Sequence, residues 1–77
     1  MFEYSICNVA DEEIFKKQCE ALKKHIPNIQ QKKIVRDVDN SLICMFNLNG
    51  KELNLYNDNN INAVYINSEF DLEKYFD

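Results

Sequence analysis

Residues 42–56 read LICMFNLNGKELNLY, and they carry the strongest structural signal in the chain. Asn49-Gly50 near the centre is typical of a two-residue turn between antiparallel strands, because such turns need positive φ angles. A turn at this dipeptide pairs Leu48 with Lys51 and thereby fixes the register of both strands. The sequence therefore predicts an antiparallel hairpin with one defined pairing.

In this register the two faces of the hairpin differ in character. The face that we expect to build the core carries five side chains: Leu42, Cys44, Phe46, Leu53 and Leu55. The second face also carries Ile43, Met45 and Tyr56 among polar residues. Because the pairing follows from the turn alone, this segregation supports the hairpin.

Upstream of the hairpin the sequence predicts one strand and one long helix. Residues 2–9 alternate between apolar and polar side chains, which is typical of a half-buried strand. Asp11 is suited to cap a helix of about four turns, which Pro27 ends. The apolar stripe of this helix comprises Ile14, Phe15, Cys19, Leu22 and Ile26.

The remaining segments predict shorter elements. We expect a strand at 33–38, a polar loop at 57–62 and a strand at 63–67. In the first of these strands Ile34 and Val38 share a face. Ser68 opens a segment that resembles a capping box, and the short helix that follows ends near Phe76.

These elements predict a single α+β domain over residues 1–77, in the order β-α-β-β-β-β with a short C-terminal helix. The natural arrangement has two layers, with one long helix packed on a four- or five-stranded, mainly antiparallel sheet. A chain of this length buries about 60% of its surface on folding, which is enough for one core.

Charge and composition exclude several functions. The chain has nine Lys and Arg against thirteen Asp and Glu, so its net charge of −4 argues against duplex DNA binding. A single glycine cannot build a phosphate-binding loop. His25 is the only histidine, and acid pairs such as Asp37 with Asp39 are expected at solvated edges. We therefore expect no enzyme and no cofactor.

The cysteines and the remaining acidic residues do not indicate a catalytic or metal-binding site. Cys7, Cys19 and Cys44 are odd in number and lack a C-x-x-C pair, which favours reduced, buried thiols. Residues 58–69 match part of a calcium-loop pattern, but Ala63 stands where the bend requires glycine, so we expect no metal site. An acidic N-terminus and the absence of a long apolar stretch predict a cytoplasmic protein without a membrane segment.

The acidic excess is confined to one end of the sequence. Residues 1–51 have a net charge of +1, whereas residues 52–77 have one lysine against six acidic residues. A negative surface with neighbouring aromatic side chains is typical of docking to a basic partner. The candidate partner-binding residues are Glu52, Tyr56, Asp58, Tyr65, Glu69, Asp71, Glu73 and Tyr75.

Small size, acidic asymmetry and the lack of catalytic groups together favour a non-enzymatic protein-binding inhibitor. In role, such a protein resembles immunity and anti-defence proteins, which neutralise a basic, nucleic-acid-acting partner such as a toxin or nuclease. Two alternatives remain open at this point. The domain could be a regulatory or assembly module that forms a homodimer through its second sheet face. Its exposed aromatic residues could also bind single-stranded nucleic acid.

Overall fold

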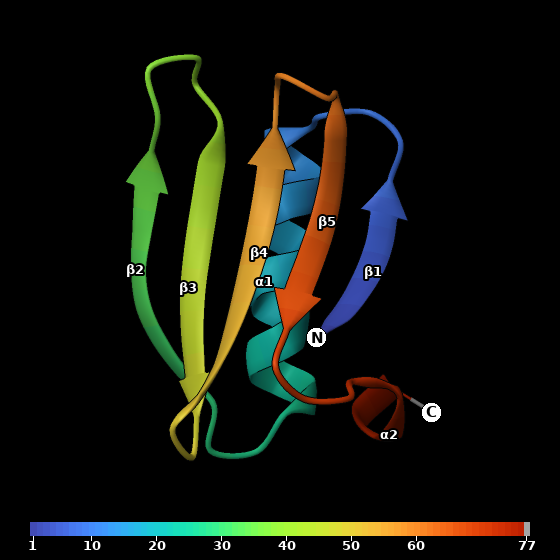
Figure 1. Ribbon diagram of the computed structural model, residues 1–77, viewed down its shortest axis with the longest axis vertical. Coiled ribbons are helices and arrows are strands. Elements are labelled where there is room, and N and C mark those ends of the chain that lie inside the picture. The colour runs from blue at the N-terminus through green and yellow to red at the C-terminus, as the bar shows by residue number, and fades with distance from the viewer. Residues whose placement is uncertain (77) are drawn as a thin grey trace.

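A computed structural model describes residues 1–76 and confirms the predicted two-layer α+β fold. The elements are β1 (Phe2–Cys7), α1 (Glu12–His25), β2 (Gln30–Arg36), β3 (Leu42–Leu48), β4 (Lys51–Asp58), β5 (Ala63–Ser68) and α2 (Glu73–Phe76). The five strands form one antiparallel sheet in the order β1-β5-β4-β3-β2. In Figure 1, α1 lies behind β4 and β5, and no described element covers the front of the sheet.

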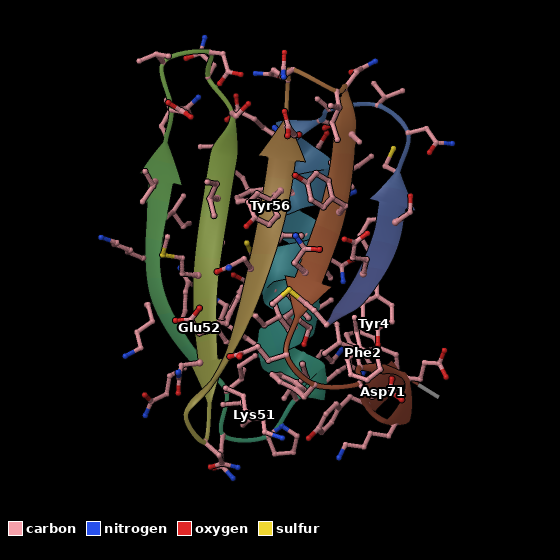
Figure 2. The ribbon with its side chains drawn as sticks, viewed as in Figure 1. Phe2, Tyr4, Lys51, Glu52, Tyr56 and Asp71 are labelled. Atoms are coloured by element: carbon pink, nitrogen blue, oxygen red, sulfur yellow. The ribbon has the colours of Figure 1, made fainter. Side chains whose placement is uncertain are left out.

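The central hairpin has the predicted register. Leu48 lies opposite Lys51, Phe46 lies opposite Leu53, and the pairing continues to the far ends of β3 and β4. At the turn, Asn49 and Gly50 have φ angles of 54° and 85°. The two faces separate as expected. Buried and half-buried side chains alternate along all of β3, and along β4 from Leu53 onward. Figure 2 views the sheet from its uncovered face.

Asparagines provide most of the tight turns. Asn28, Asn40, Asn49 and Asn62 all have φ angles between 54° and 69°. They lie, in this order, in the four connections that join α1, β2, β3, β4 and β5. Asparagine enters this left-handed region more readily than most residues, because its short amide bonds to the local backbone. Every connection from α1 to β5 therefore contains an asparagine in this conformation.

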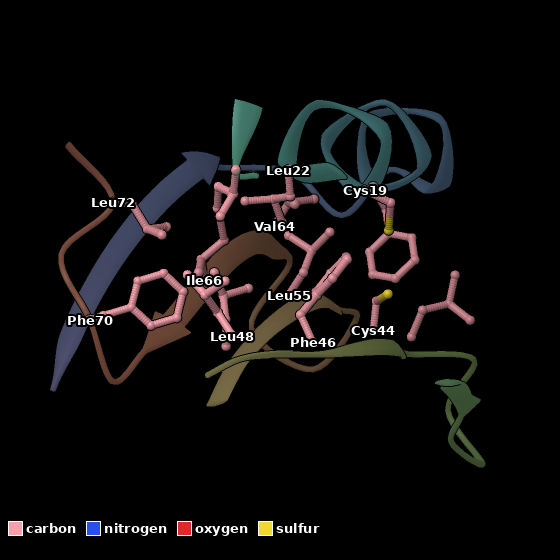
Figure 3. Packing of buried hydrophobic residues seen from close by; sticks show 14 residues of the cluster. Cys19, Leu22, Cys44, Phe46, Leu48, Leu55, Val64, Ile66, Phe70 and Leu72 are labelled. Carbon is pink, nitrogen blue, oxygen red and sulfur yellow. The ribbon is translucent and has the colours of Figure 1, made fainter. Parts of the chain in front are cut away.

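The core lies between α1 and the sheet. Figure 3 shows its packing, with α1 on one side and the strands on the other. Its 14 buried members are Phe15, Cys19, Leu22, Ile26, Leu42, Cys44, Phe46, Leu48, Leu53, Leu55, Val64, Ile66, Phe70 and Leu72. All five residues of the predicted helix stripe contact this cluster, although Ile14 is only partly buried. The core-facing set of the hairpin is also confirmed.

Two core thiols face each other across the layers. Cys19 of α1 and Cys44 of β3 point toward one another in Figure 3. They are 5% and 0% exposed, whereas Cys7 is only partly buried. The neighbouring Cys19 thiol, together with burial, raises the pKa of the Cys44 thiol above its usual range. Because a protonated thiol is a poor nucleophile, Cys44 is chemically protected in the folded protein.

This protection gives a simple labelling test. When the native protein is treated with iodoacetamide at about pH 8.5, near the pKa of an unperturbed thiol, Cys7 is expected to be alkylated first. Cys19 and Cys44 are expected to react only after urea is added, because both are buried. Mass spectrometry of proteolytic fragments measures the order of modification. Equal labelling of Cys7 and Cys44 in the native state would contradict the buried pair.

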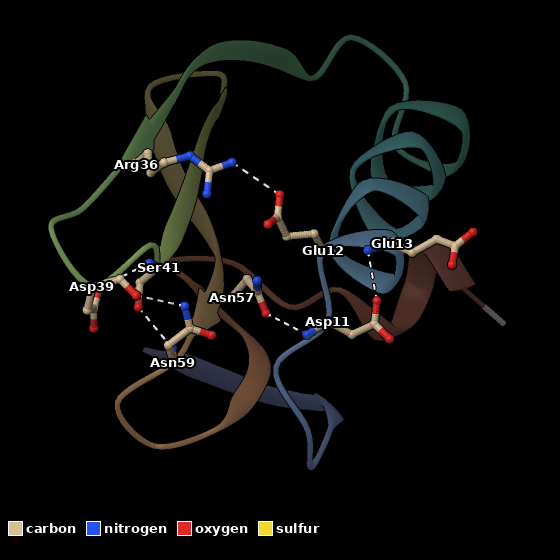
Figure 4. A network of polar contacts seen from close by, with 8 residues as sticks. All are labelled: Asp11, Glu12, Glu13, Arg36, Asp39, Ser41, Asn57 and Asn59. Carbon is tan, nitrogen blue, oxygen red and sulfur yellow. Dashed lines mark hydrogen bonds and ion pairs between the residues drawn. The ribbon is translucent and has the colours of Figure 1, made fainter.

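The N-terminus of α1 is capped as predicted and tied to two strands. Asp11 Oδ1 accepts hydrogen bonds from the amides of Glu13 and Ile14, at 2.8 and 3.2 Å. Figure 4 shows the Asp11–Glu13 contact and the ion pair between Glu12 and Arg36 of β2, at 3.1 Å. These contacts fix the start of the helix over one end of the sheet.

The prediction for β2 was displaced along the chain. Its strand covers Gln30–Arg36 rather than 33–38, and Val38 is fully exposed in the turn that follows. The reason is the turn itself, in which the Asp37 amide donates to Ser41 O at 2.8 Å. This bond closes the β2–β3 connection directly after Arg36.

The polar loop predicted at 57–62 was wrong at its first two positions. β4 continues to Asp58, and Asn57 occupies a core-facing position between Leu42 and Val64. Only 2% of Asn57 is exposed, and its Oδ1 accepts a hydrogen bond from the Asp11 amide at 2.9 Å. The amide is buried because it anchors the segment that leads into α1 (Figure 4).

The cap of the terminal helix also differs from the prediction. Ser68 is the last residue of β5, and its buried Oγ accepts from the Phe70 amide and donates to Phe70 O. Asp71 caps α2 instead, since its Oδ1 accepts from the Glu73 amide at 3.0 Å. Phe70 and Leu72 hold this segment to the core, whereas Phe76 is 41% exposed.

Candidate functional site

The uncovered face of the sheet has no packing partner among the described elements. Its apolar and aromatic members are partly exposed and come from four strands: Val35, Ile43, Met45, Tyr56, Ala63 and Tyr65. Asn47, Asn54 and Asn67 lie on the same face of the inner strands. This mixed face differs from the opposite one, whose central positions are apolar and buried beneath α1.

Two tyrosines form the centre of this face. Tyr56 of β4 lies directly opposite Tyr65 of β5, and their rings stack with centroids 4.8 Å apart at 15°. The Tyr65 hydroxyl donates to Asp58 Oδ2 at 3.3 Å. Burial raises the pKa of Tyr65, and the nearby Asp58 carboxylate adds to the shift. The phenol therefore stays neutral at physiological pH.

Three aspartates gather beside the tyrosines. Asp37 and Asp39 from the β2–β3 turn join Asp58, Tyr56 and Tyr65 in lining a recess of about 260 Å³. We call these five residues the aspartate–tyrosine recess. Hydrogen bonds from the Ser41 amide and hydroxyl lower the pKa of Asp39, so this carboxylate is ionised at neutral pH.

The recess is held in place by contacts between two loops. The Ser41 amide donates to Asp39 Oδ1 at 3.0 Å, and Ser41 Oγ accepts from the Asn59 amide at 2.9 Å. The Asn59 side chain also donates to Asp39 O at 2.9 Å. Figure 4 shows this network, which joins the β2–β3 turn to the β4–β5 turn. The aspartates are thus positioned by the fold before any partner arrives.

Of the eight residues predicted from the sequence, the structure gathers three in the recess: Tyr56, Asp58 and Tyr65. Glu52 lies on the same face of β4, but four residues of extended strand place it about 13 Å from Tyr56. Glu69 is its neighbour, because the Glu52 amide donates to Glu69 Oε1 at 2.6 Å. These two glutamates form a separate acidic pair.

The remaining three predicted residues belong to the C-terminal segment. Asp71 accepts from the Tyr4 hydroxyl at 2.9 Å, and the bonds from the Glu73 amide and Tyr4 lower its pKa. Tyr75 packs edge-on against Phe70, with centroids 6.3 Å apart. Figure 2 places Asp71 beside α2, away from Tyr56. Asp71 and Tyr75 therefore help attach the tail, and the eight residues do not form one patch.

Sequence reasoning missed the contribution of Asp37 and Asp39 to the recess. Both were expected at a solvated edge, and both are exposed. The sequence did not predict that they lie beside Tyr56, Asp58 and Tyr65. The available signal was the hairpin register, since Leu42 opposite Asn57 brings the preceding turn beside the end of β4. Recognising the recess also required the pairing of β5 with β4.

Within residues 1–76, no three His, Cys, Asp or Glu side chains are arranged to hold a metal ion. In the same range, no helix has the length and apolar character needed to cross a membrane. Comparison of the chain with protein families, curated proteins and solved structures gave no match.

Proposed function

We propose that the protein is a non-enzymatic binding domain that docks a basic protein on its uncovered sheet face. The observation that carries this proposal is the aspartate–tyrosine recess, in which stacked aromatic rings adjoin three carboxylates. A guanidinium group binds well in such a place, because it stacks on a tyrosine face and donates to carboxylate oxygens. Arginine and tyrosine are also the residue types that anchor many protein interfaces.

The dimensions of the domain support a role as an inhibitor. Its accessible surface is 5055 Å², and a standard interface of about 800 Å² per partner would cover about a sixth of it. A rigid sheet face of this size can block a cleft by occupying it. Proteins that act on nucleic acids carry basic clefts, so a nuclease-like toxin is the class of partner that we propose.

The same charges disfavour the two alternative functions. A single strand of nucleic acid would bring its phosphates against Asp37, Asp39 and Asp58. A second copy docked face to face would bring an identical set of carboxylates, and like charges in close contact cost several kcal/mol. The recess therefore favours a basic protein partner over both.

A defined peptide tests the recess directly. An acetylated triarginine amide added to ¹⁵N-labelled protein is expected to shift the backbone amide signals of Tyr56, Asp58 and Tyr65. The double variant Tyr56→Ala/Asp58→Asn is expected to weaken this binding about tenfold, which corresponds to about 1.4 kcal/mol. Glu13→Gln is the control, because it removes one negative charge from the outer surface of α1. A triglutamate peptide is expected to cause no shift.

A pattern of shifts spread evenly over all acidic residues would contradict binding at the recess. Equal affinity of the double variant and the Glu13→Gln control for triarginine would also contradict it. The inhibitory role has a test of its own. The wild-type chain is used to capture a partner from native lysate, and the purified partner is assayed for nuclease activity. We expect the wild-type chain to inhibit this activity and the double variant to have lost the inhibition.

A further inference from the structure

We propose that the free edge of β1, with the groove beside it, binds an extended segment of a partner protein that alternates apolar and basic side chains. This site lies outside the aspartate–tyrosine recess, so it goes beyond the function proposed above. Strand addition of this kind uses main-chain hydrogen bonds for affinity and alternate side chains for specificity. Three features of β1 and its surroundings support it.

The first feature is the exposed backbone of β1. This strand pairs with β5 on one side and is the outermost strand of the sheet on the other. Figure 1 shows no described element beyond it. Along the outer edge of an antiparallel sheet, alternate residues direct unpaired N–H and C=O groups outward. Residues 2–7 contain no lysine, arginine or proline that would discourage pairing.

The opposite edge of the sheet is built differently. All seven residues of β2 are exposed, and Lys32, Lys33 and Arg36 occupy this strand. Its pairing with β3 is also irregular between Gln31 and Lys33. Edge lysines and bulges are the features by which natural sheets resist pairing with another chain. β1 has its irregularity only near its end, between Ser5 and Cys7. The two edges are therefore not equivalent.

The second feature is a groove of about 490 Å³ alongside β1, a volume typical of ligand-binding pockets. It exists because α1 packs over the middle of the sheet and leaves the inner side of β1 only partly covered (Figure 1). Ile66 and Leu72 are buried residues that line it. Ala21 of α1 has a small side chain that leaves space at the helix wall. The remaining apolar and aromatic lining residues are Tyr4, Ile6, His25 and Phe76.

The groove lies where a paired segment would direct its side chains. Tyr4 is opposite Ile66 and shares its α1-facing side of the sheet. In a strand added to β1, every second side chain would point to this same side and enter the groove. Phe2, which is 44% exposed, gives further apolar surface beside Tyr4 (Figure 2). The segment must therefore carry apolar residues at alternate positions.

The third feature is the charge around β1, which indicates basic residues at the intervening positions. These side chains would lie on the uncovered face, where the exposed Glu3 of β1 lies opposite Asn67 and diagonal to Tyr65. Glu73 lies at the groove on the other side of the sheet, so Glu3 is the acidic residue of β1 that faces the intervening positions. A second copy paired through β1 would instead add another Glu3 with no basic residue in the same strand. A basic segment of another protein therefore fits better than self-association.

A synthetic peptide tests the proposal on the intact chain. The probe is a seven-residue, acetylated and amidated peptide that alternates lysine and leucine. Titrated into ¹⁵N-labelled protein, it is expected to shift the amide signals of β1 and of Ala21 in a saturable manner. A peptide that alternates lysine and serine keeps the charge but not the apolar side chains. It is expected to bind β1 at least about tenfold more weakly.

Matched variants separate this site from the recess. Ala21→Trp fills the groove and is expected to weaken binding of the lysine–leucine peptide at β1 at least about tenfold. Ala63→Trp adds the same bulk on the uncovered face and is expected to leave that binding unchanged. Glu3→Lys reverses one exposed charge without touching the core, and we expect a several-fold loss. Dispersed amide spectra check that each variant remains folded.

Three outcomes overturn the proposal. One is peptide-induced shifts confined to Tyr56, Asp58 and Tyr65, which would leave the recess as the only basic-partner site. Another is unchanged affinity at β1 in both Ala21→Trp and Glu3→Lys. The third is no shift in β1 at a peptide concentration of about 1 mM, the weak end of the affinity scale. Failure of triarginine to bind the recess, by contrast, would affect only the proposed function.

Discussion

Ile66→Ala is expected to lower the free energy of unfolding by about 2–5 kcal/mol. Ile66 lies on β5 with 1% of its surface exposed, within the core cluster. Removing its outer carbons loses hydrophobic transfer energy and leaves a cavity that the layers cannot fully close. Domains of this size have total stabilities of about 4–12 kcal/mol. The variant is therefore expected to lose a large fraction of the total stability of the domain.

Urea denaturation followed by circular dichroism measures this loss. The matched control is Ile34→Ala, which makes the same change on strand β2, where 50% of the side chain is exposed. Ile34→Ala replaces the same β-branched residue in a strand but creates no buried cavity. We therefore expect it to lower the free energy of unfolding by less than about 1 kcal/mol. Equal destabilisation of the two variants would mean that Ile66 does not lie in a packed core.

Asn57→Ala is expected to cost about 1–3 kcal/mol, the penalty for a buried hydrogen-bonding group that loses its partner. In the native protein the Asp11 amide donates to Asn57 Oδ1 at 2.9 Å, and Asn57 is 2% exposed. Alanine removes this acceptor, so the Asp11 amide loses its hydrogen bond to Asn57 at the start of α1. The effect therefore reaches the helix through the segment that precedes it.

Asn54→Ala is the control for this variant. Asn54 lies three residues earlier on β4, on the uncovered face. Replacing it is expected to change the free energy of unfolding by about 0.5 kcal/mol or less, as most surface substitutions do. Chemical denaturation measures both variants, and hydrogen exchange at the Asp11 amide reports the local effect. Unchanged exchange at Asp11 in Asn57→Ala would show that this hydrogen bond does not hold the helix start.

Local patterns in the sequence were sufficient for most of the fold. The Asn49-Gly50 turn is set by two adjacent residues, and the register of β3 and β4 follows from it by counting. The long helix was equally accessible, because Asp11 and Pro27 mark its ends and its apolar stripe repeats at helical spacing. In each case the deciding interactions are between residues close in sequence.

The errors arose where distant segments meet. Asn57 looked like the start of a polar loop, but its amide is a core residue because the Asp11 segment needs an acceptor there. Val38 looked like a strand residue, but hydrogen bonds around Asp37 end the strand before it. Neither contact is encoded in a periodic pattern.

The candidate site was predictable only in part for the same reason. Tyr56, Asp58 and Tyr65 were identified as binding residues from charge and aromatic content, and the structure brings these three together. The acids of the C-terminal segment looked equivalent in sequence. Asp71 instead bonds to Tyr4 and caps α2, on another part of the surface. Charge counting finds acidic segments but does not assign them to a common face.

The asparagines in the turns affect the unfolded chain as well as the folded one. The sequence has eleven asparagines and one glycine, and four of these asparagines occupy left-handed positions that glycine usually fills. Glycine visits more backbone conformations when the chain is unfolded, so it loses more entropy on folding. A side chain at such a position reduces this loss by up to about 1 kcal/mol, where the native conformation tolerates it. Asn28, Asn40, Asn49 and Asn62 thus narrow the unfolded ensemble of a domain whose core is small.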